Sequence, residues 1–177
     1  PVSQNYFYKY FDTNSFIDWW IVNEIGKNVD ANFHYSCFMY LDPSDQKLHM
    51  GPLWDFDIAN GNVNFTDAQY YSGWWINQTK WLKQMFADPV FVIKAKRRWN
   101  DKKTEIDNWV NNLIQEKANS LQNDVMRNFY RWPILGTYVW PNAAGYANRT
   151  TYQSEIDFLK TWTKNRIDWM DMEINGW

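Results

Sequence analysis

Apolar side chains recur at a spacing of three and four residues in three stretches of the chain, and each stretch predicts a helix with one buried face. The first stretch follows Asp12–Ser15, which offers several N-cap side chains, and ends at Gly26. The second starts at Asp88-Pro89, a pair typical of a helix N-terminus, and its helical tendency continues to Trp132. The third spans Tyr152–Ile174. We expect these three faces to form the core of the protein.

The pattern changes to a period of two between the first and second helices. Apolar and aromatic side chains alternate through Phe33–Leu41, and a turn at Asp42–Asp45 leads into the short run Lys47–Met50. This order predicts a β-hairpin. The region 59–75 is rich in Asn, Gly, Tyr and Ser without a sustained period, which predicts a long loop of the kind that often lines a site. A short helix is expected over 78–86.

Together these elements predict one mainly helical α+β domain over residues 1–177, with a small hairpin near its front. The chain begins at Pro1 and already reaches the aromatic run Tyr6–Phe11 within its first residues, so we expect it to be a fragment of a longer protein. Its 13 Trp, 11 Tyr and 11 Phe predict an aromatic-rich core and aromatic-rich clefts. A net charge of −2 argues against nucleic acid as a partner. We expect no membrane span, since no apolar run approaches the roughly 20 residues that a bilayer requires.

Candidate chemistry is concentrated in the segment Gly51–Asp57, which reads Gly-Pro-Leu-Trp-Asp-Phe-Asp. In an extended backbone Asp55 and Asp57 would point to the same side, while Trp54 and Phe56 would pack on the other. Two like charges this close favour a neutralising cation, and Mg²⁺, Mn²⁺ and Ca²⁺ are the ions that prefer carboxylate oxygens. The same spacing also fits a carboxylate pair that caps a turn or accepts backbone N–H groups.

Further motifs surround this segment. They are Asn23-Glu24, Asn28-Val29-Asp30 and Asn60-Gly61-Asn62, followed downstream by Trp132–Gly136, Tyr138–Asn142 and Arg166–Asp171. In this order and spacing they resemble the CotH kinase family, atypical protein kinases named for a spore coat protein and widespread in secreted bacterial proteins. The downstream motifs are similar to a bacterial subgroup of that family. The resemblance covers nearly the whole chain.

The resemblance implies a kinase-like fold, of which this chain would be the larger, helical lobe, and metal-dependent transfer of phosphate from ATP to a hydroxyl of a protein substrate. By order along the chain, Asp30 matches the aspartate that positions the acceptor hydroxyl, and Asp55 and Asp57 match the metal-binding aspartate. Asn32 is the candidate for the asparagine that completes the metal shell, although it lies closer to Asp30 than is usual in protein kinases. Candidate supporting or substrate-contacting residues are Asn28, Asn60 and Asn62.

Two features depart from a complete kinase. The glycines nowhere form the Gly-x-Gly of a phosphate-clamping loop, and Asp30 lies only a short helix after the start of the chain. We therefore expect this chain alone to bind a divalent cation but to transfer phosphate poorly or not at all. The family also implies an extracytoplasmic location, secreted or at the cell surface. Without the family pattern, Asp30 is better explained as a C-capping turn residue after Gly26.

Two other classes of function fit the sequence. A glycan-binding module would stack sugar rings on loop aromatics, of which Tyr70-Tyr71, Trp74-Trp75 and Trp140 are the candidates, although such pairs also fit a buried loop. A kinase-like scaffold would keep the fold and only bind partners, and the intact acidic positions argue against it. His34 and His49 lie near the acidic segment in sequence, and we expect both to be structural.

Overall fold

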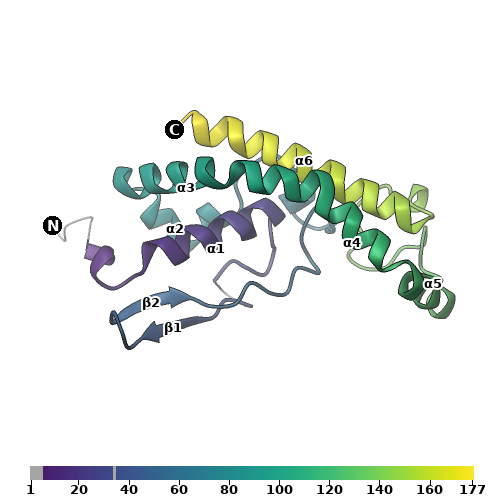
Figure 1. Ribbon diagram of the computed structural model, residues 1–177, viewed down its shortest axis with the longest axis horizontal. Coiled ribbons are helices and arrows are strands. Elements are labelled where there is room, and N and C mark those ends of the chain that lie inside the picture. The colour runs from purple at the N-terminus through teal and green to yellow at the C-terminus, as the bar shows by residue number, and fades with distance from the viewer. Residues whose placement is uncertain (1–5, 34) are drawn as a thin grey trace.

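The computed structural model describes residues 6–33 and 35–177, and over this range the protein is mainly helical with one small sheet. Two long helices, α3 (Pro89–Asn108) and α6 (Tyr152–Asn175), lie side by side along the long axis of the molecule (Figure 1). Helix α1 (Thr13–Gly26) packs against both of them. The hairpin of β1 (Met39–Asp42) and β2 (Lys47–Met50) lies next to α1, on the side away from α3 (Figure 1).

Shorter elements connect these parts. Helices α4 and α5 continue from α3 toward the end of the molecule farthest from the hairpin (Figure 1). The remaining elements are η1 (Tyr6–Lys9), η2 (Asp67–Gln69), η3 (Ile76–Gln78), α2 (Lys80–Met85), a single π-helical segment η4 (Trp109–Leu113), α4 (Ile114–Ser120), α5 (Gln122–Arg131) and η5 (Tyr146–Asn148). The predicted α+β class with a small hairpin is confirmed, and so are the three long helices.

The helices begin where polar caps satisfy their first N–H groups. The Asp12 carboxylate accepts the N–H groups of Asn14 and Ser15 at the start of α1. The Asp88 carboxylate likewise accepts an N–H at the start of α3, with Pro89 in the first turn. Helix α1 ends at Gly26 as predicted, and the left-handed residue that caps it is Lys27, at φ 43°.

The hairpin is shorter than the sequence pattern predicts. Its register pairs Met39 with Met50 and Asp42 with Lys47, so the strand expected from Phe33 begins only at Met39. Phe33 and Ser36 have φ values of 63° and 52°, in the left-handed region that extended strands exclude. The backbone therefore turns at these two residues, and β1 begins only after them.

The core lies between α1, α3 and α6 and contains the predicted apolar faces. Trp109, which follows α3 directly, is 46% exposed and lines an open pocket between α1 and α3. The fully buried side chains from the three helices include Phe16, Ile17, Trp20, Phe91, Ala95, Trp99, Ile167, Met170 and Ile174. Burial of this apolar area is the main stabilising contribution to the fold.

A buried ion pair joins α1 to α6 beneath the long loop. Arg166 donates to the Glu24 carboxylate over 2.6 Å, and both side chains are inaccessible to solvent. Arg166 also donates to the carbonyls of Tyr71 and Gly73, at 2.7 and 2.8 Å. The Glu24 carboxylate accepts backbone N–H groups from Trp75, Ile76 and Asn77. The pair therefore fixes the loop as well as the two helices.

A second buried cation holds the same loop. The Lys27 ammonium donates to the carbonyls of Asp67, Tyr70 and Ser72, at 2.8–2.9 Å. Burial lowers the pKa of Lys27 to about 8, the nearby Arg166 charge adding to that effect. The predicted long loop over 59–75 is thus present and is rigidly attached to the C-terminal end of α1.

Candidate functional site

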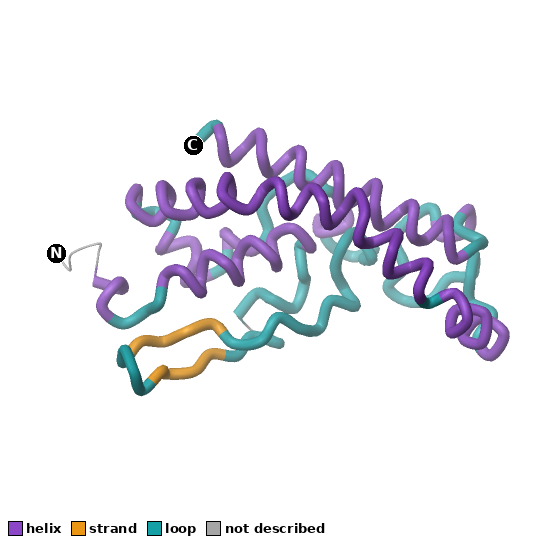
Figure 2. Tube along the Cα trace, in the orientation of Figure 1, coloured by secondary structure: helices purple, strands orange, loops and turns teal. Residues whose placement is uncertain are grey.

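Asp30, Asp55 and Asp57 converge on one spot. Each offers a carboxylate oxygen, and these oxygens lie within 4.8 Å of one another. Asp30 comes from the turn after α1, and the other two come from the segment after β2; both segments are loops (Figure 2). Asp30 is half-buried, while Asp55 and Asp57 are exposed. The cluster is therefore open to solvent on one side.

Asn28 ties the two segments of the cluster together. This side chain is 1% exposed, and its Nδ2 donates to the carbonyl of Asp55 over 3.1 Å and to Oδ1 of Asn23 over 3.2 Å. Its Oδ1 accepts the N–H of Asp30 over 3.2 Å. One amide thus joins α1, the turn that carries Asp30 and the acidic segment. The sequence placed Asn28 among the supporting residues, and the geometry agrees with such a position.

The predicted proximity of Asp55 and Asp57 is present, but its predicted cause is wrong. Asp55 has φ 63°, so the backbone is not extended here and simple alternation does not bring the two carboxylates together. Trp54, expected to pack in an apolar layer, is 48% exposed and donates from Nε1 to the carbonyl of Ser36 over 3.0 Å. Ser36 Oγ in turn donates to Asp55 Oδ2 over 2.8 Å. A tight turn, rather than a strand, shapes the acidic segment.

Phe56 and the residues after it attach the acidic segment to the end of α1. The Phe56 ring lies over Gly26, where an added Cβ would meet Phe56 Cδ1 at 3.4 Å. Val29 donates its N–H to Ile58 O over 3.0 Å, and Asn60 donates its N–H to Gly26 O over 2.7 Å. These main-chain contacts hold the acidic segment beside the turn of Asp30.

The other predicted asparagines lie around the cluster in different ways. Asn62 donates from Nδ2 to the carbonyl of Asp57 over 3.0 Å, and Asn142 donates to Asn62 Oδ1 over 3.4 Å. Asn60 contributes through its backbone, in a left-handed conformation at φ 52°. Asn32 lies in the turn that follows Asp30 and stays a candidate amide ligand.

The surroundings of Asp30 disfavour its charged form. Partial burial raises the pKa of Asp30, and the charges of Asp55 and Asp57 raise it further. A divalent cation at this spot would remove the repulsion, and carboxylate and amide oxygens are the ligands that Mg²⁺ and Ca²⁺ prefer. The cluster thus has the donor chemistry of a hard-cation site.

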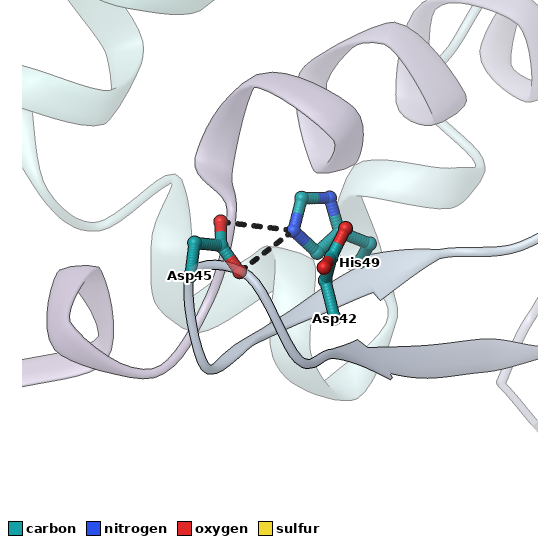
Figure 3. Close-up of side chains that lie close together, drawn as sticks. All are labelled: Asp42, Asp45 and His49. Atoms are coloured by element: carbon teal, nitrogen blue, oxygen red, sulfur yellow. Dashed lines mark hydrogen bonds and ion pairs between the residues drawn. The ribbon is translucent and has the colours of Figure 1, made fainter.

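A second group of acidic residues lies at the tip of the hairpin (Figure 3). Asp42, Asp45 and His49 also offer ligand atoms within 4.8 Å of one another. Both ring nitrogens of His49 are engaged, because Nε2 lies 3.1 Å from Asp45 Oδ2 and Nδ1 lies 3.1 Å from Asp12 Oδ2. His49 therefore connects the hairpin to the N-cap of α1, which agrees with the structural role expected for it. The other histidine, His34, lies outside the described residues.

The aromatic residues proposed for glycan stacking separate into two groups. Trp74 packs against Trp20, Trp169 and Trp177 within the core, and Trp75 is also half-buried there. Trp140 is 63% exposed. Tyr70 and Tyr71 are also exposed. A platform made of the adjacent Trp74-Trp75 pair is therefore wrong, and Trp140 stays open to a ligand.

Sequence reasoning missed several residues that shape the site. Ser36 carried no signal, because one serine in an aromatic run is typical of a strand edge. Lys27 carried none either, since a single lysine after a helix is usually solvated. Glu24 and Arg166 stood in the family motifs, but their pairing across 142 positions has no local signature.

The fold and the cluster define a mainly helical α+β domain that presents three carboxylates beside a hairpin. This chain belongs to the CotH kinase family, since the model of the family described as CotH kinase protein matches residues 3–170. No curated protein and no solved structure matches the chain. Among the described residues, no helix combines the length and the apolar character needed to cross a membrane.

Proposed function

We propose that this chain is the helical, metal-holding part of a kinase-like domain that transfers phosphate from ATP to a hydroxyl of a protein substrate. The observation that carries the proposal is the convergence of Asp30, Asp55 and Asp57 on one solvent-open spot. Family membership supports the kinase-like character. Phosphoryl transfer relies mainly on positioning and charge neutralisation, and a carboxylate cluster of this kind can supply both through a bound cation.

The surroundings of each residue suggest its role in the proposed reaction. Asp55 and Asp57, which are exposed, would hold a divalent cation, Mg²⁺ or Mn²⁺ and in second place Ca²⁺, with Asn32 as an added oxygen ligand. The cation would neutralise the phosphate oxygens. Asp30 would orient the acceptor hydroxyl, and its raised pKa makes it a better proton acceptor than an ordinary aspartate.

Asn28 and Asn62 would act as positioning residues. Asn28 fixes the carbonyl of Asp55 and the N–H of Asp30 through one amide group. Asn62 fixes the carbonyl of Asp57. Asn60 would set the bend of the chain between these points. Such support matters because a displacement of about 1 Å in a catalytic group can lower the rate about a hundredfold.

The hairpin region offers an exposed apolar surface, which we propose as the place of the nucleotide base. Large side chains of the hairpin and of the segment after it are exposed, namely Phe38, Tyr40, Leu41, Leu53 and Trp54. Two of these, Phe38 and Trp54, lie against each other with ring centroids 5.4 Å apart. An apolar surface beside a metal site suits the base of ATP, which would lie there while its phosphates face the carboxylates.

We keep two expectations from the sequence within this proposal. Transfer by residues 1–177 alone is expected to be weak, since the sequence carries no Gly-x-Gly to clamp the phosphates. The location is expected to be extracytoplasmic, secreted or at the cell surface, as the family resemblance implies.

The proposal is tested by thermal unfolding with Mg²⁺ alone, ATP alone and both together. We expect ATP to raise the melting temperature only when Mg²⁺ is present, and we expect Asp57→Asn to abolish the rise. Asp45→Asn is the matched control, because it removes one carboxylate from the hairpin cluster of Figure 3 and leaves the three-aspartate cluster intact. An equal rise in Asp57→Asn, or no rise with any combination, would contradict the proposal and favour a scaffold that only binds partners.

One observation keeps glycan binding as a second candidate. The Trp140 ring is exposed and parallel to Phe65, with an interplanar angle of 3° and centroids 5.7 Å apart. The two rings are stacked on each other and both are exposed, so an outer ring face of the pair is a surface on which a sugar ring can stack. Retention on immobilised polysaccharide should weaken in Trp140→Ala if this reading holds, and should stay unchanged in Trp132→Ala, another exposed tryptophan.

A further inference from the structure

A pocket of about 380 Å³ lies between α1 and α3, and its lining includes Phe56 but none of the three clustered carboxylates. Its apolar walls come from both helices and from the acidic segment, namely Ile21, Val22, Ile25, Phe56, Ile106 and Trp109. Pockets that bind small molecules typically measure about 300–1,000 Å³, with apolar walls and few polar groups. This pocket has that size and that lining.

The charged residues at the rim of the pocket neutralise each other. Arg98 donates to both oxygens of Asp18, at 2.6 and 2.8 Å. Lys102 donates to both oxygens of Glu105 over 2.9 Å. Each cation is thus paired with one carboxylate, so the charged part of the pocket lining has no net charge to attract an ionic ligand. Charge complementarity favours an uncharged occupant.

The pocket shares its wall with the acidic segment. Phe56 lies between Asp55 and Asp57 in the sequence, and its ring both rests on Gly26 and lines the pocket. Asn60, another lining residue, is bonded through its N–H to the carbonyl of Gly26. A molecule in the pocket would therefore press on the segment that carries two of the three carboxylates.

We infer that this pocket binds an uncharged, apolar small molecule, and that its occupancy changes the cation affinity of the three-aspartate cluster through Phe56. The binding step stands apart from the proposed function, whereas the effect on the cation rests on it. Binding in the pocket and its effect on cation affinity are measured in separate experiments, so a negative result in one does not decide the other. A ligand that held Phe56 in place would favour one arrangement of Asp55 and Asp57 and so act as a regulator.

The test uses a matched pair of fluorescent probes on the whole chain. Phenylnaphthylamine is uncharged, and anilinonaphthalene sulfonate adds a sulfonate to the same ring system. We expect phenylnaphthylamine to bind saturably with one molecule per chain, and the sulfonated analogue to bind more weakly. Val22→Trp should fill the pocket and weaken binding by about tenfold or more. Val22 is 37% exposed, so the larger side chain does not disturb the core.

Two further variants make the result specific. Trp109→Ala removes one wall and should also weaken binding, while Ile93→Trp is the control, since Ile93 lies elsewhere on α3 and is 66% exposed. The affinity for Mn²⁺ is measured first without probe and then with saturating phenylnaphthylamine. We expect the two values to differ by about fivefold. Equal binding to wild type and Val22→Trp would overturn the pocket assignment. An unchanged Mn²⁺ affinity would overturn the link to the cluster, and absence of Mn²⁺ binding without probe would count against the proposed function instead.

Discussion

At the scale of single residues, the site is a group of charges held in an unfavourable arrangement. Burial and two neighbouring carboxylates raise the pKa of Asp30, so its ionised form is less stable in the folded chain than in the unfolded one. Asp55 adds a left-handed backbone at φ 63°, which is uncommon for a residue with a side chain. Costs of this kind are typical of functional positions, where stability gives way to activity.

Asp30→Asn should therefore stabilise the protein in the absence of metal. The folded-state pKa of Asp30 lies above its ordinary value of 3.8, so the folded chain binds this proton more tightly than the unfolded chain. The contribution of Asp30 to stability consequently falls as the pH rises through the window just above 3.8. At neutral pH we expect a gain on the order of 1 kcal/mol, since the like-charge contacts of this largely solvent-accessible carboxylate are screened by water.

Thermal unfolding in chelator between acidic and neutral pH measures this difference. The melting temperatures of the wild type and of Asp30→Asn should be closest at acidic pH, and the difference between them should grow as the pH rises. Asp101→Asn, at an exposed position of α3, controls for the loss of one carboxylate elsewhere. A destabilised Asp30→Asn at neutral pH would show that the aspartate serves the fold and not a ligand.

The residues of the cluster could be predicted from the sequence, but the backbone geometry that brings them together could not. Asp55 and Asp57 could be paired because their spacing is local, and Asp30 could be added because the family order places it there. The contacts of Ser36 with Asp55 and Trp54 were not predictable, because they depend on two left-handed residues in a run with strand-like composition.

At the scale of elements, the helices were predicted closely and the strand was not. Polar caps such as Asp12 and Asp88 are local signals, and the structure uses both. The strand from Phe33 was overestimated because side-chain alternation does not report the backbone turns at Phe33 and Ser36. The conformation of the loop 59–75 depends on close contacts with distant residues, and amino-acid composition does not reveal which residues make them. Gly61, between two candidate asparagines, is the clearest case.

Gly61→Ala should destabilise the protein strongly. Gly61 has φ +79°, and an added Cβ would lie 2.4 Å from Nε1 of Trp162, whose N–H donates to Gln69 O. Backbone strain and the clash together should cost about 2–4 kcal/mol, measured by urea unfolding. Gly73→Ala is the matched control, because Gly73 has φ +81° but only Lys27 Nζ, at 4.0 Å, near its Cβ position. Equal losses in the two variants would mean that the contact with Trp162 contributes nothing.

At the scale of the whole molecule, one buried ion pair connects the parts that support the site. Glu24 lies near the C-terminal end of α1, four residues before Asn28, and Arg166 lies on α6. Their contact also fixes the loop at Tyr71, Gly73 and Trp75. No local pattern predicts such a pair, since the two residues are far apart in sequence and each alone looks like a surface charge.

Arg166→Ala should be one of the most destabilising substitutions in the chain. It leaves the Glu24 carboxylate buried without its cation, which typically costs about 3–5 kcal/mol. Glu24→Gln, which keeps the shape, should also lower the urea midpoint because it replaces an acceptor of three N–H groups. Arg127→Ala, in an exposed pair with Asp124 at 3.8 Å, should change the midpoint little. Similar midpoints for Arg166→Ala and Arg127→Ala would contradict the role given to the buried pair.

The most direct test of the central claim is calorimetric titration of Mn²⁺ into the wild-type chain, the double variant Asp55→Asn/Asp57→Asn and the hairpin control Asp45→Asn. We predict one saturable site in the wild type and in the hairpin control, and loss of that site in the double variant, because the exposed carboxylates supply its ligands. Retained binding in the double variant, or loss of binding in Asp45→Asn, would place the cation elsewhere and contradict a metal centre formed by Asp30, Asp55 and Asp57.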